Sequence, residues 1–314
     1  MKSLIKEVAI TPEVFEPLCY DTAREHRVAI RTIFDALEGT GLVSNLADGQ
    51  WISYLSSSIN RISPAALKLI KFLAERDRLV DRPKFSESPI NTDRDWFLEA
   101  ISLAEKKYID GVITTEDEFA NNKAHPLDLD DSQDWWIKPL NLQKSVNRNI
   151  EEYITFLKPL LLSSKNRITI YDRYLFDDKP DSSYRDFSKL ISVCKDNKYK
   201  PSIELHRAIP SPKEKEHFFS EVSWKSHFSL VTKVAQTYGL NIYVNIWDSR
   251  TLYTENSGPH PRFISSKIGS FQFDHGFSQG RGKNRISIMN KSESDLWQGN
   301  FRSTTNKPVF SFKL

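Results

Sequence analysis

Apolar residues recur at helical spacing in the first part of the chain and in shorter runs in the second part. Ser63 followed by Pro64 is typical of a helix start, and apolar residues follow these two at intervals of three or four. A second apolar stripe predicts a helix from near Asp93 to Tyr108. Residues 112–114 form a short predicted strand after it. This part of the chain is therefore predicted to be mainly α-helical.

Strand and helix patterns alternate in the second part. Strands rich in β-branched and aromatic residues are predicted over 167–174, 202–206 and 241–247. Helices are predicted between them, over 184–194 and along an apolar stripe from Trp224 to Tyr238 that Gly239 ends. This order predicts an α/β domain with parallel strand pairing and crossover helices. Three shorter strands are predicted after it, over 262–267, 270–273 and 285–289.

Residues 121–148 follow neither period. They contain an acidic run at 128–134 and the pair Trp135 and Trp136. We interpret them as a connecting segment between a mainly helical domain over 1–120 and an α/β domain over 149–314. The two tryptophans are expected to pack between the domains or to stack on nucleic-acid bases.

Charge is divided unevenly between the two halves. The formal net charge of the chain is +3. Residues 1–150 hold 19 Lys and Arg against 24 Asp and Glu, a net charge of −5, whereas residues 151–314 hold 25 against 17, a net charge of +8. The basic half predicts a polyanionic partner, and nucleic acid fits that description. Attraction between the two halves is the alternative explanation.

The cysteines and the hydropathy of the chain bear on its compartment. Cys19 and Cys194 are too few for a disulfide framework or a zinc site, and we expect both to be packing residues in a reducing compartment. No apolar run approaches the roughly 20 residues that a bilayer crossing needs, and no secretory signal is evident. These features predict a cytoplasmic protein without a transmembrane segment.

Six of the eleven glycines lie beyond residue 250, among basic residues. Glycine lets a backbone approach a ligand closely, and basic side chains beside it suit phosphate. His260 and Arg262 are two positions apart, so on a strand both would point to one face. The histidine could then act as nucleophile or proton donor while the arginine holds the phosphate oxygens.

We therefore predict His260 and Arg262 as catalytic residues. The predicted phosphate-binding residues are Lys267, Gly276, Ser278, Arg281 and Lys283. A basic hairpin with two glycine turns is the alternative.

These residues resemble the motif of the phospholipase-D-like family, and the likeness covers about residues 165–300. Members carry His-x-Lys, then an aspartate, then a Gly-Ser-x-Asn turn. In this chain Arg262 stands in place of the lysine, Lys267 in place of the aspartate, and Gly276 near the place of the turn. Asn284 and Asn290 are candidates for the asparagine, although neither has the family's spacing.

Variants with His-x-Arg are similar to the C-terminal domain of MIT-domain proteins and to phospholipase-D-like proteins of bacterial phage-defence loci. Asp172 and Tyr174 match the strand-end Asp-x-Tyr of those variants. The resemblance implies a mixed-sheet α/β fold and a nuclease-type phosphodiesterase in anti-phage defence that needs no cofactor. In active members one histidine forms a phosphohistidine and a second protonates the leaving oxygen.

A single His-x-Arg motif leaves the second histidine to be supplied. The resemblance implies a homodimer, or a second histidine of this chain such as His206 or His275. The missing lysine and aspartate leave two alternatives to an enzyme. One is a catalytically inactive module that binds phosphate or the nucleic-acid backbone. The other is an interaction subunit that works with a separate ATPase, since the chain has no Walker motif.

The first domain carries a second resemblance. Asp95 lies at the start of a predicted helix, and the strand after that helix closes with a threonine-rich segment ending in Asp117. This is similar to the end of a PIN nuclease domain, and it implies Mg²⁺ or Mn²⁺ bound by acids such as Asp95 and Asp117. The segment Val8–Pro12 lacks the aspartate that the family carries there. An ordinary helical domain is the alternative.

Overall fold

The structure is a computed structural model, and the contacts between its residues divide it into two units. It describes residues 4–117, 120, 122–129, 135–136, 143–173, 175, 180–209, 220–248, 262–277, 280–302 and 307–314. The N-terminal unit comprises residues 5–140, and the C-terminal unit comprises residues 141–314 with residues 1–4. Each unit has its own sheet, and the chain has the α/β fold class that the sequence predicted.

The N-terminal unit is built around a parallel sheet. The order of its strands is β3-β2-β1-β4-β5, and every neighbouring pair is parallel. Their bounds are β1 Glu7–Ile10, β2 Leu42–Asn45, β3 Leu79–Asp81, β4 Gly111–Ile113 and β5 Lys123–Ala124. The first two strands are buried at all four positions, so they show no alternation of apolar and polar residues. Because these strands lack the alternation that marks a strand in a sequence, the pattern did not reveal them, and it indicated mainly helix in this unit.

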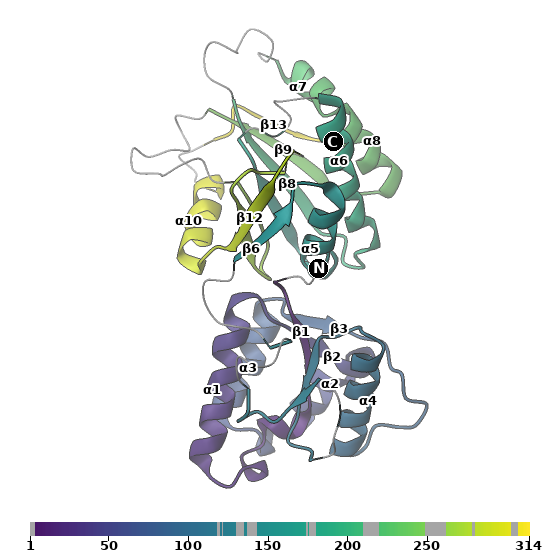
Figure 1. Ribbon diagram of the computed structural model, residues 1–314, viewed down its shortest axis with the longest axis vertical. Helices are drawn as coiled ribbons and strands as arrows, with labels where there is room; N and C mark the ends of the chain where they lie inside the picture. The colour runs from purple at the N-terminus through teal and green to yellow at the C-terminus, as the bar shows by residue number, and fades with distance from the viewer. Residues whose placement is uncertain are drawn as a thin grey trace. The chain divides into compact units, whose positions relative to one another are not determined.

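The helices of this unit include both that the sequence predicted. Ser63 caps α3 by accepting a hydrogen bond from the backbone N–H of Ala66, and Thr92 caps α4. Helices α1 and α3 lie on one side of the sheet and α4 lies on the other (Figure 1). The bounds are η1 Pro12–Phe15, η2 Pro17–Cys19, α1 Ala23–Thr40, α2 Leu46–Ser57, η3 Ile59–Arg61, α3 Pro64–Glu75 and α4 Asp93–Glu105.

The predicted connecting segment supplies a strand to each sheet. β5 extends the N-terminal sheet, and β6 (Gln143–Asn147) extends the C-terminal sheet. Trp135 and Trp136 are buried in the core of the N-terminal unit, where a Cβ atom on Gly111 would lie only 2.1 Å from the Trp135 ring. The expectation that these tryptophans stack on bases is therefore wrong, because the core of one unit already encloses them.

The C-terminal unit has a mixed sheet with the order β13-β9-β8-β7-β10-β11-β12-β6. β7, β8 and β9 are parallel, and the strands on both sides of them are antiparallel. The strands are β7 Arg167–Tyr171, β8 Ser202–Ala208, β9 Ile242–Trp247, β10 Phe263–Ser265, β11 Ser270–Phe273, β12 Lys283–Ile288 and β13 Phe310–Lys313. This confirms the parallel pairing predicted for the three longer strands.

The helices predicted over 184–194 and from Trp224 to Tyr238 are present, whereas the helices Ile150–Ser163 and Lys291–Arg302 were not predicted. The stripe from Trp224 to Tyr238 forms two helices that meet at Phe228, and Gly239 ends the second with a φ of +61°. Tyr238 is 40% exposed, so its assignment to the buried stripe is wrong. The helices are α5 Ile150–Ser163, α6 Pro180–Ser192, η4 Val193–Asp196, α7 Glu221–His227, α8 Ser229–Tyr238 and α10 Lys291–Arg302.

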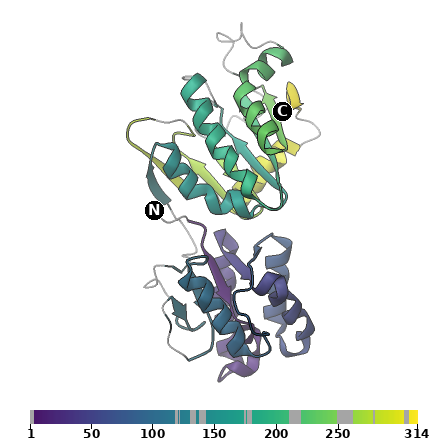
Figure 2. The ribbon, with the colours of Figure 1, turned by 90° about the vertical axis from the view of Figure 1, so that its right-hand side faces the viewer.

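Side chains alternate across this sheet, and its two faces differ in character. On β7, Ile168 and Ile170 belong to an apolar face, whereas Arg167 and Thr169 belong to a polar face. Helices α5, α6 and α8 lie side by side over the apolar face (Figure 2). Helix α10 lies on the opposite, polar face (Figure 1), where Trp297 packs on Tyr171.

Two further expectations can be compared with the structure. No helix in the described part of the chain combines the length and apolar character that a bilayer crossing requires. Cys194 is a buried packing residue as expected, whereas Cys19 is exposed at the end of η2. Both cysteines are free thiols.

Candidate functional site

The end of β7 brings together residues that are far apart in the sequence. Phe263 of β10 pairs with Tyr171 of β7, which places Arg262 beside Asp172. The Nε atom of Arg262 lies 3.6 Å from Oδ1 of Asp172, and the Asp172 residue is only 4% exposed. A buried carboxylate needs a counter charge, so this ion pair fixes the Arg262 side chain at the end of the sheet.

A turn around Gly276 closes over this ion pair. Gly276 has a φ of +67°, and a Cβ atom there would lie 2.2 Å from Oδ2 of Asp172 and 2.7 Å from Cδ of Arg262. The backbone N–H of Phe277 donates to the same Asp172 oxygen at 3.3 Å, and Arg262 donates to the carbonyl of Asp274. Glycine is required here because both the left-handed backbone and the close approach exclude a side chain.

Asn284 secures the other side of the turn. Its Nδ2 donates to the Gly276 carbonyl at 2.8 Å and to the Tyr153 hydroxyl at 2.9 Å, while its Oδ1 accepts from the backbone N–H of His275 at 3.0 Å. Its side chain is completely buried. Of the two asparagines considered from the sequence, Asn284 is therefore the one that contacts the glycine turn.

Two residues beside this turn were missed from the sequence. Tyr153 of α5 lies behind Asn284, and its burial raises the pKa of the phenol, although hydrogen bonds from Asn284 and Arg148 oppose that effect. The guanidinium of Arg148 lies against Gly280, where a Cβ atom would be 2.7 to 2.9 Å from its atoms. No signal pointed to Arg148, because it follows a short polar strand that carries no clear period.

His206 lies on the opposite face of the sheet from Arg262. His206 pairs with Tyr171, so these two side chains share the polar face, whereas Asp172 and Arg262 are each one residue away from that face. The His206 ring stacks on Phe301 of α10 with the ring centroids 4.0 Å apart, and the residue is 2% exposed. The structure therefore does not bring His206 to the Asp172–Arg262 pair.

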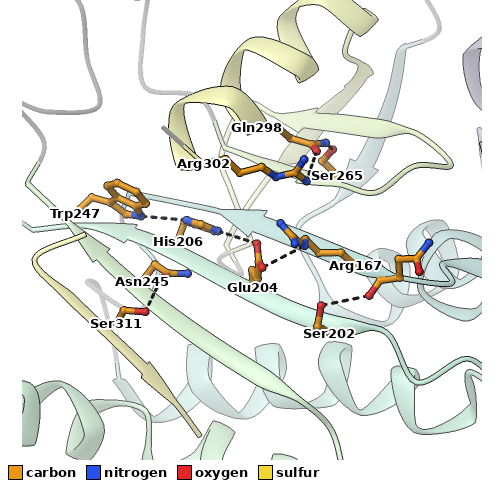
Figure 3. Close-up of polar contacts among 11 residues, drawn as sticks. Arg167, Ser202, Glu204, His206, Asn245, Trp247, Ser265, Gln298, Arg302 and Ser311 are labelled. Carbon is orange, nitrogen blue, oxygen red and sulfur yellow. Dashed lines mark hydrogen bonds and ion pairs between the residues drawn. The ribbon is translucent and has the colours of Figure 1, made fainter. Parts of the chain in front are cut away.

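His206 belongs to a chain of polar contacts beneath α10 (Figure 3). The indole N–H of Trp247 donates to Nδ1 of His206 at 3.0 Å, and Nε2 of His206 lies 3.7 Å from Oε2 of Glu204. The other Glu204 oxygen lies 3.2 Å from Nε of Arg167. Burial lowers the pKa of His206, so the neutral ring with its proton on Nε2 fits this arrangement. These contacts connect β7, β8 and β9 in the middle of the sheet.

The other predicted phosphate-binding residues are divided between separate places. Lys267 is exposed after β10, at the end of that strand opposite to Arg262. Lys283 is exposed and points away from Gly276, because Asn284 next to it occupies the turn side of β12. Arg281 is exposed beside Gly282, and His275 is exposed in the turn. His260, Tyr174 and Ser278 lie outside the described residues.

The predicted metal ligands of the N-terminal unit are not grouped. Asp95 forms a capping box at the start of α4, where its Oδ2 accepts from the backbone N–H groups of Asn91 and Thr92 at 2.9 and 2.8 Å. Asp117 is exposed beyond β4. Among the residues that the structure describes, no three His, Cys, Asp or Glu side chains are arranged to hold a metal ion. Asp95 thus has a structural role in helix capping.

A buried acid that the sequence did not single out lies in the N-terminal unit, at the end of the parallel sheet where β1 and β4 end. Glu13 follows β1 and is 3% exposed. Thr11 and Thr114 donate hydrogen bonds to its Oε1, the second at 2.7 Å. Burial raises the pKa of Glu13 to about 7 and outweighs these hydrogen bonds.

The sequence and its structure were also compared with those of known proteins. No protein-family model matches the sequence, and no curated protein matches it. Among solved structures, NucT from Helicobacter pylori is similar at 12% identity and a TM-score of 0.34, over 55% of this chain and 99% of NucT. Phosphatidylserine synthase from Haemophilus influenzae Rd KW20 is similar at 12% identity and a TM-score of 0.30, over 81% of this chain and 55% of the synthase.

A third solved structure is TrmBL2, an archaeal chromatin protein. It is similar at 9% identity and a TM-score of 0.28, over 53% of this chain and 54% of TrmBL2. This chain therefore spans about half the length of TrmBL2 and of the synthase.

The Glu13→Gln variant is expected to change how stability depends on pH. The folded state keeps the Glu13 proton up to about pH 7, whereas the unfolded state loses it near the ordinary value of 4.5. The free energy of unfolding of the wild type should therefore fall relative to the variant as the pH rises through this interval, by about 3 kcal/mol in all. Urea unfolding of both proteins between pH 4.5 and 8 measures this difference, and parallel profiles would contradict the buried protonated acid.

Substitution of Gly276 tests the packing of the turn. Gly276→Ala should lower the free energy of unfolding by about 3 kcal/mol or more, because strain at positive φ adds to overlap with Asp172. Gly239→Ala is the matched control, since Gly239 also has a positive φ but a Cβ atom there would meet no other atom within 4 Å. The control should cost only about 1 kcal/mol. Equal losses in urea unfolding would show that the close approach to Asp172 contributes nothing.

Proposed function

We propose that the C-terminal unit is a phospholipase-D-like phosphodiesterase that binds and cleaves nucleic acid. The observation that carries this proposal is the Asp172–Arg262 pair beneath the Gly276 turn. It fixes an arginine at the end of the sheet, two residues after a histidine, beside a glycine turn and a second arginine, Arg148. A guanidinium that is held in place can stabilise the negative charge of a phosphate group during its transfer.

In this proposal His260 is the nucleophile. Its neutral imidazole nitrogen attacks phosphorus and forms an N–P bond, and the bond to the leaving oxygen breaks. Water then attacks the phosphohistidine, and cleavage of the N–P bond releases the phosphate end and restores the imidazole. Arg262 stabilises the charge on the non-bridging oxygens in both steps, and Asp172 orients Arg262.

The proton for the leaving oxygen comes from a second copy of the chain in this proposal. His206 is buried on the other face of the sheet, so it is badly placed to serve the phosphate that Arg262 contacts. A homodimer would bring a second His260 to the same phosphodiester. After this second imidazole has protonated the leaving oxygen, it accepts the proton of the water that attacks the phosphohistidine. The reaction assigned to these residues uses only nucleophilic and acid–base chemistry of side chains and needs no metal ion.

An alternative is that the site binds the nucleic-acid backbone without cleaving it. One observation favours this alternative: Asp172 already balances the charge of Arg262. Position 267, where the family carries its aspartate, is also a lysine at the far end of β10. Tight binding of oligonucleotides by wild-type protein that shows no cleavage would support binding alone.

The His260→Ala variant tests the enzyme directly. With end-labelled single-stranded and double-stranded DNA and RNA in the presence of EDTA, wild-type protein should cleave at least one substrate. The variant should cleave that substrate at least about a hundredfold more slowly, because the nucleophile is removed. His125→Ala, which changes a histidine of the N-terminal unit, is the control and should keep the wild-type rate. Unchanged cleavage by His260→Ala would exclude the role assigned to His260.

The resemblance to proteins of phage-defence loci supports a defence role for this activity, with a separate ATPase as partner. Phage should then form fewer plaques on cells that produce the wild-type chain together with such a partner than on cells that produce His260→Ala with the same partner. Equal plating by a cleavage-competent protein and its variant would contradict the defence role while leaving the enzyme proposal intact.

A further inference from the structure

The polar face of the C-terminal sheet is exposed near its edge strand β6. Lys283 and Arg285 of β12 are exposed on this face, and so are Asn147, Ser145 and Gln143 of β6. We call these five residues the β6–β12 face. Helix α10 covers the middle of the same side, where Trp297 and Phe301 pack on Tyr171.

The strand register arranges the β6–β12 face as two parallel rows. Lys283 is opposite Asn147, and Arg285 is opposite Ser145, so a basic row runs beside a neutral row of amides and a hydroxyl. The two cations are two residues apart on one strand, which separates them by about 6.8 Å. This distance is comparable to the separation of successive phosphates in an extended single strand. Neither β6 nor β12 contains an acidic residue. Two acids lie beside them: Asp274 is exposed and continues β11 opposite Arg285, and Glu152 accepts a hydrogen bond from the Asn147 amide.

This surface is distinct from the Asp172–Arg262 site. Asn284 lies between Lys283 and Arg285 in the sequence, and its side chain points to the opposite face, where it contacts Gly276 and Tyr153. The turn that carries Gly276 leads directly into β12. A nucleic-acid strand bound along the β6–β12 face would therefore reach the ends of the β-strands at which the Arg262 site lies.

We propose that the β6–β12 face binds the backbone of a single-stranded nucleic acid. Lys283 and Arg285 would contact successive phosphates, while Ser145 and Gln143 of β6 would face the sugars and bases. The basic row is only one strand wide, which suits one backbone rather than the two of a duplex. The net charge of +8 over residues 151–314 adds long-range attraction for a polyanion. The inference rests on the proposed function for its substrate class, but binding to this face does not require cleavage.

The test compares the salt dependence of binding for three full-length proteins, all carrying His260→Ala so that the probes stay intact. The first has no further change, the second carries Lys283→Gln and Arg285→Gln, and the third carries Lys233→Gln and Lys313→Gln. Lys233 is exposed on α8, and Lys313 is exposed on β13 at the opposite end of the sheet, so the third protein is a control of equal charge. The probes are fluorescent dT and U oligonucleotides, and a duplex of the same length.

Each phosphate contact of a single strand contributes about 0.7 to the slope of log K against log salt concentration. The second protein should therefore show a slope smaller by about 1.4 and a roughly tenfold weaker affinity at 0.1 M salt, whereas the control should keep most of both. An unchanged slope in the second protein would overturn the inference. Equal loss in the control, or tighter binding of the duplex with the same loss, would also overturn it.

These outcomes are separable from those of the proposed enzyme. If cleavage depends on His260 but the salt slope of binding does not depend on Lys283 and Arg285, the enzyme proposal stands and the proposal for the β6–β12 face is refuted. If the protein cleaves no substrate but shows the predicted decrease in salt slope, the proposal for the β6–β12 face stands and the enzyme proposal is refuted. Circular dichroism of the three proteins confirms that substitutions of exposed residues leave the fold unchanged.

Discussion

A carboxylate buried at the end of β7 is the constraint on which the candidate site depends. Asp172 is almost fully enclosed, and a charge in that position requires a partner of opposite charge and hydrogen bonds. Arg262 provides the charge from the start of β10, and the backbone of Phe277 provides a hydrogen bond from the turn after β11. Gly276 provides the room for both. One acid thereby joins three segments of the chain at one end of the sheet.

The alternation of side chains across the sheet then decides which basic residues can act together. Arg262 lies on the side of the Gly276 turn with Arg148, whereas Lys283 and Arg285 lie on the side of α10. His206 also lies on the side of α10, where its contacts with Trp247 and Phe301 hold a neutral ring in the interior. A basic segment that looks continuous in the sequence therefore forms two surfaces with different properties, one enclosed and one open.

The sequence predicted those elements whose signals are local. Ser63 and Thr92 start their helices as caps, Gly239 ends one, and the long strands of the second half alternate or carry β-branched residues. In the N-terminal sheet the sequence predicted β4, whereas β1 and β2 escaped prediction because they are short and buried throughout. Fold class and parallel pairing thus followed from pattern alone, whereas the first sheet did not.

The candidate site was predictable only in part, because its geometry depends on register. The sequence pointed to Arg262, Gly276 and Asp172, which the structure brings together. It could not separate Lys283 from them, since a single residue along β12 decides which face a side chain occupies. Tyr153 and Arg148 were missed because their contact with Asn284 and Gly280 links segments that are more than 130 residues apart.

The central claim is that His260, two residues before Arg262 in the sequence, attacks the phosphodiester. Rapid acid-free quenching of the wild-type protein during cleavage of an oligonucleotide, followed by mass spectrometry of its peptides, tests this claim directly. The account predicts a nucleotide joined through phosphorus to the peptide that contains His260. Cleavage that proceeds with the covalent nucleotide on a different residue, or with none on any peptide at any quench time, would contradict it.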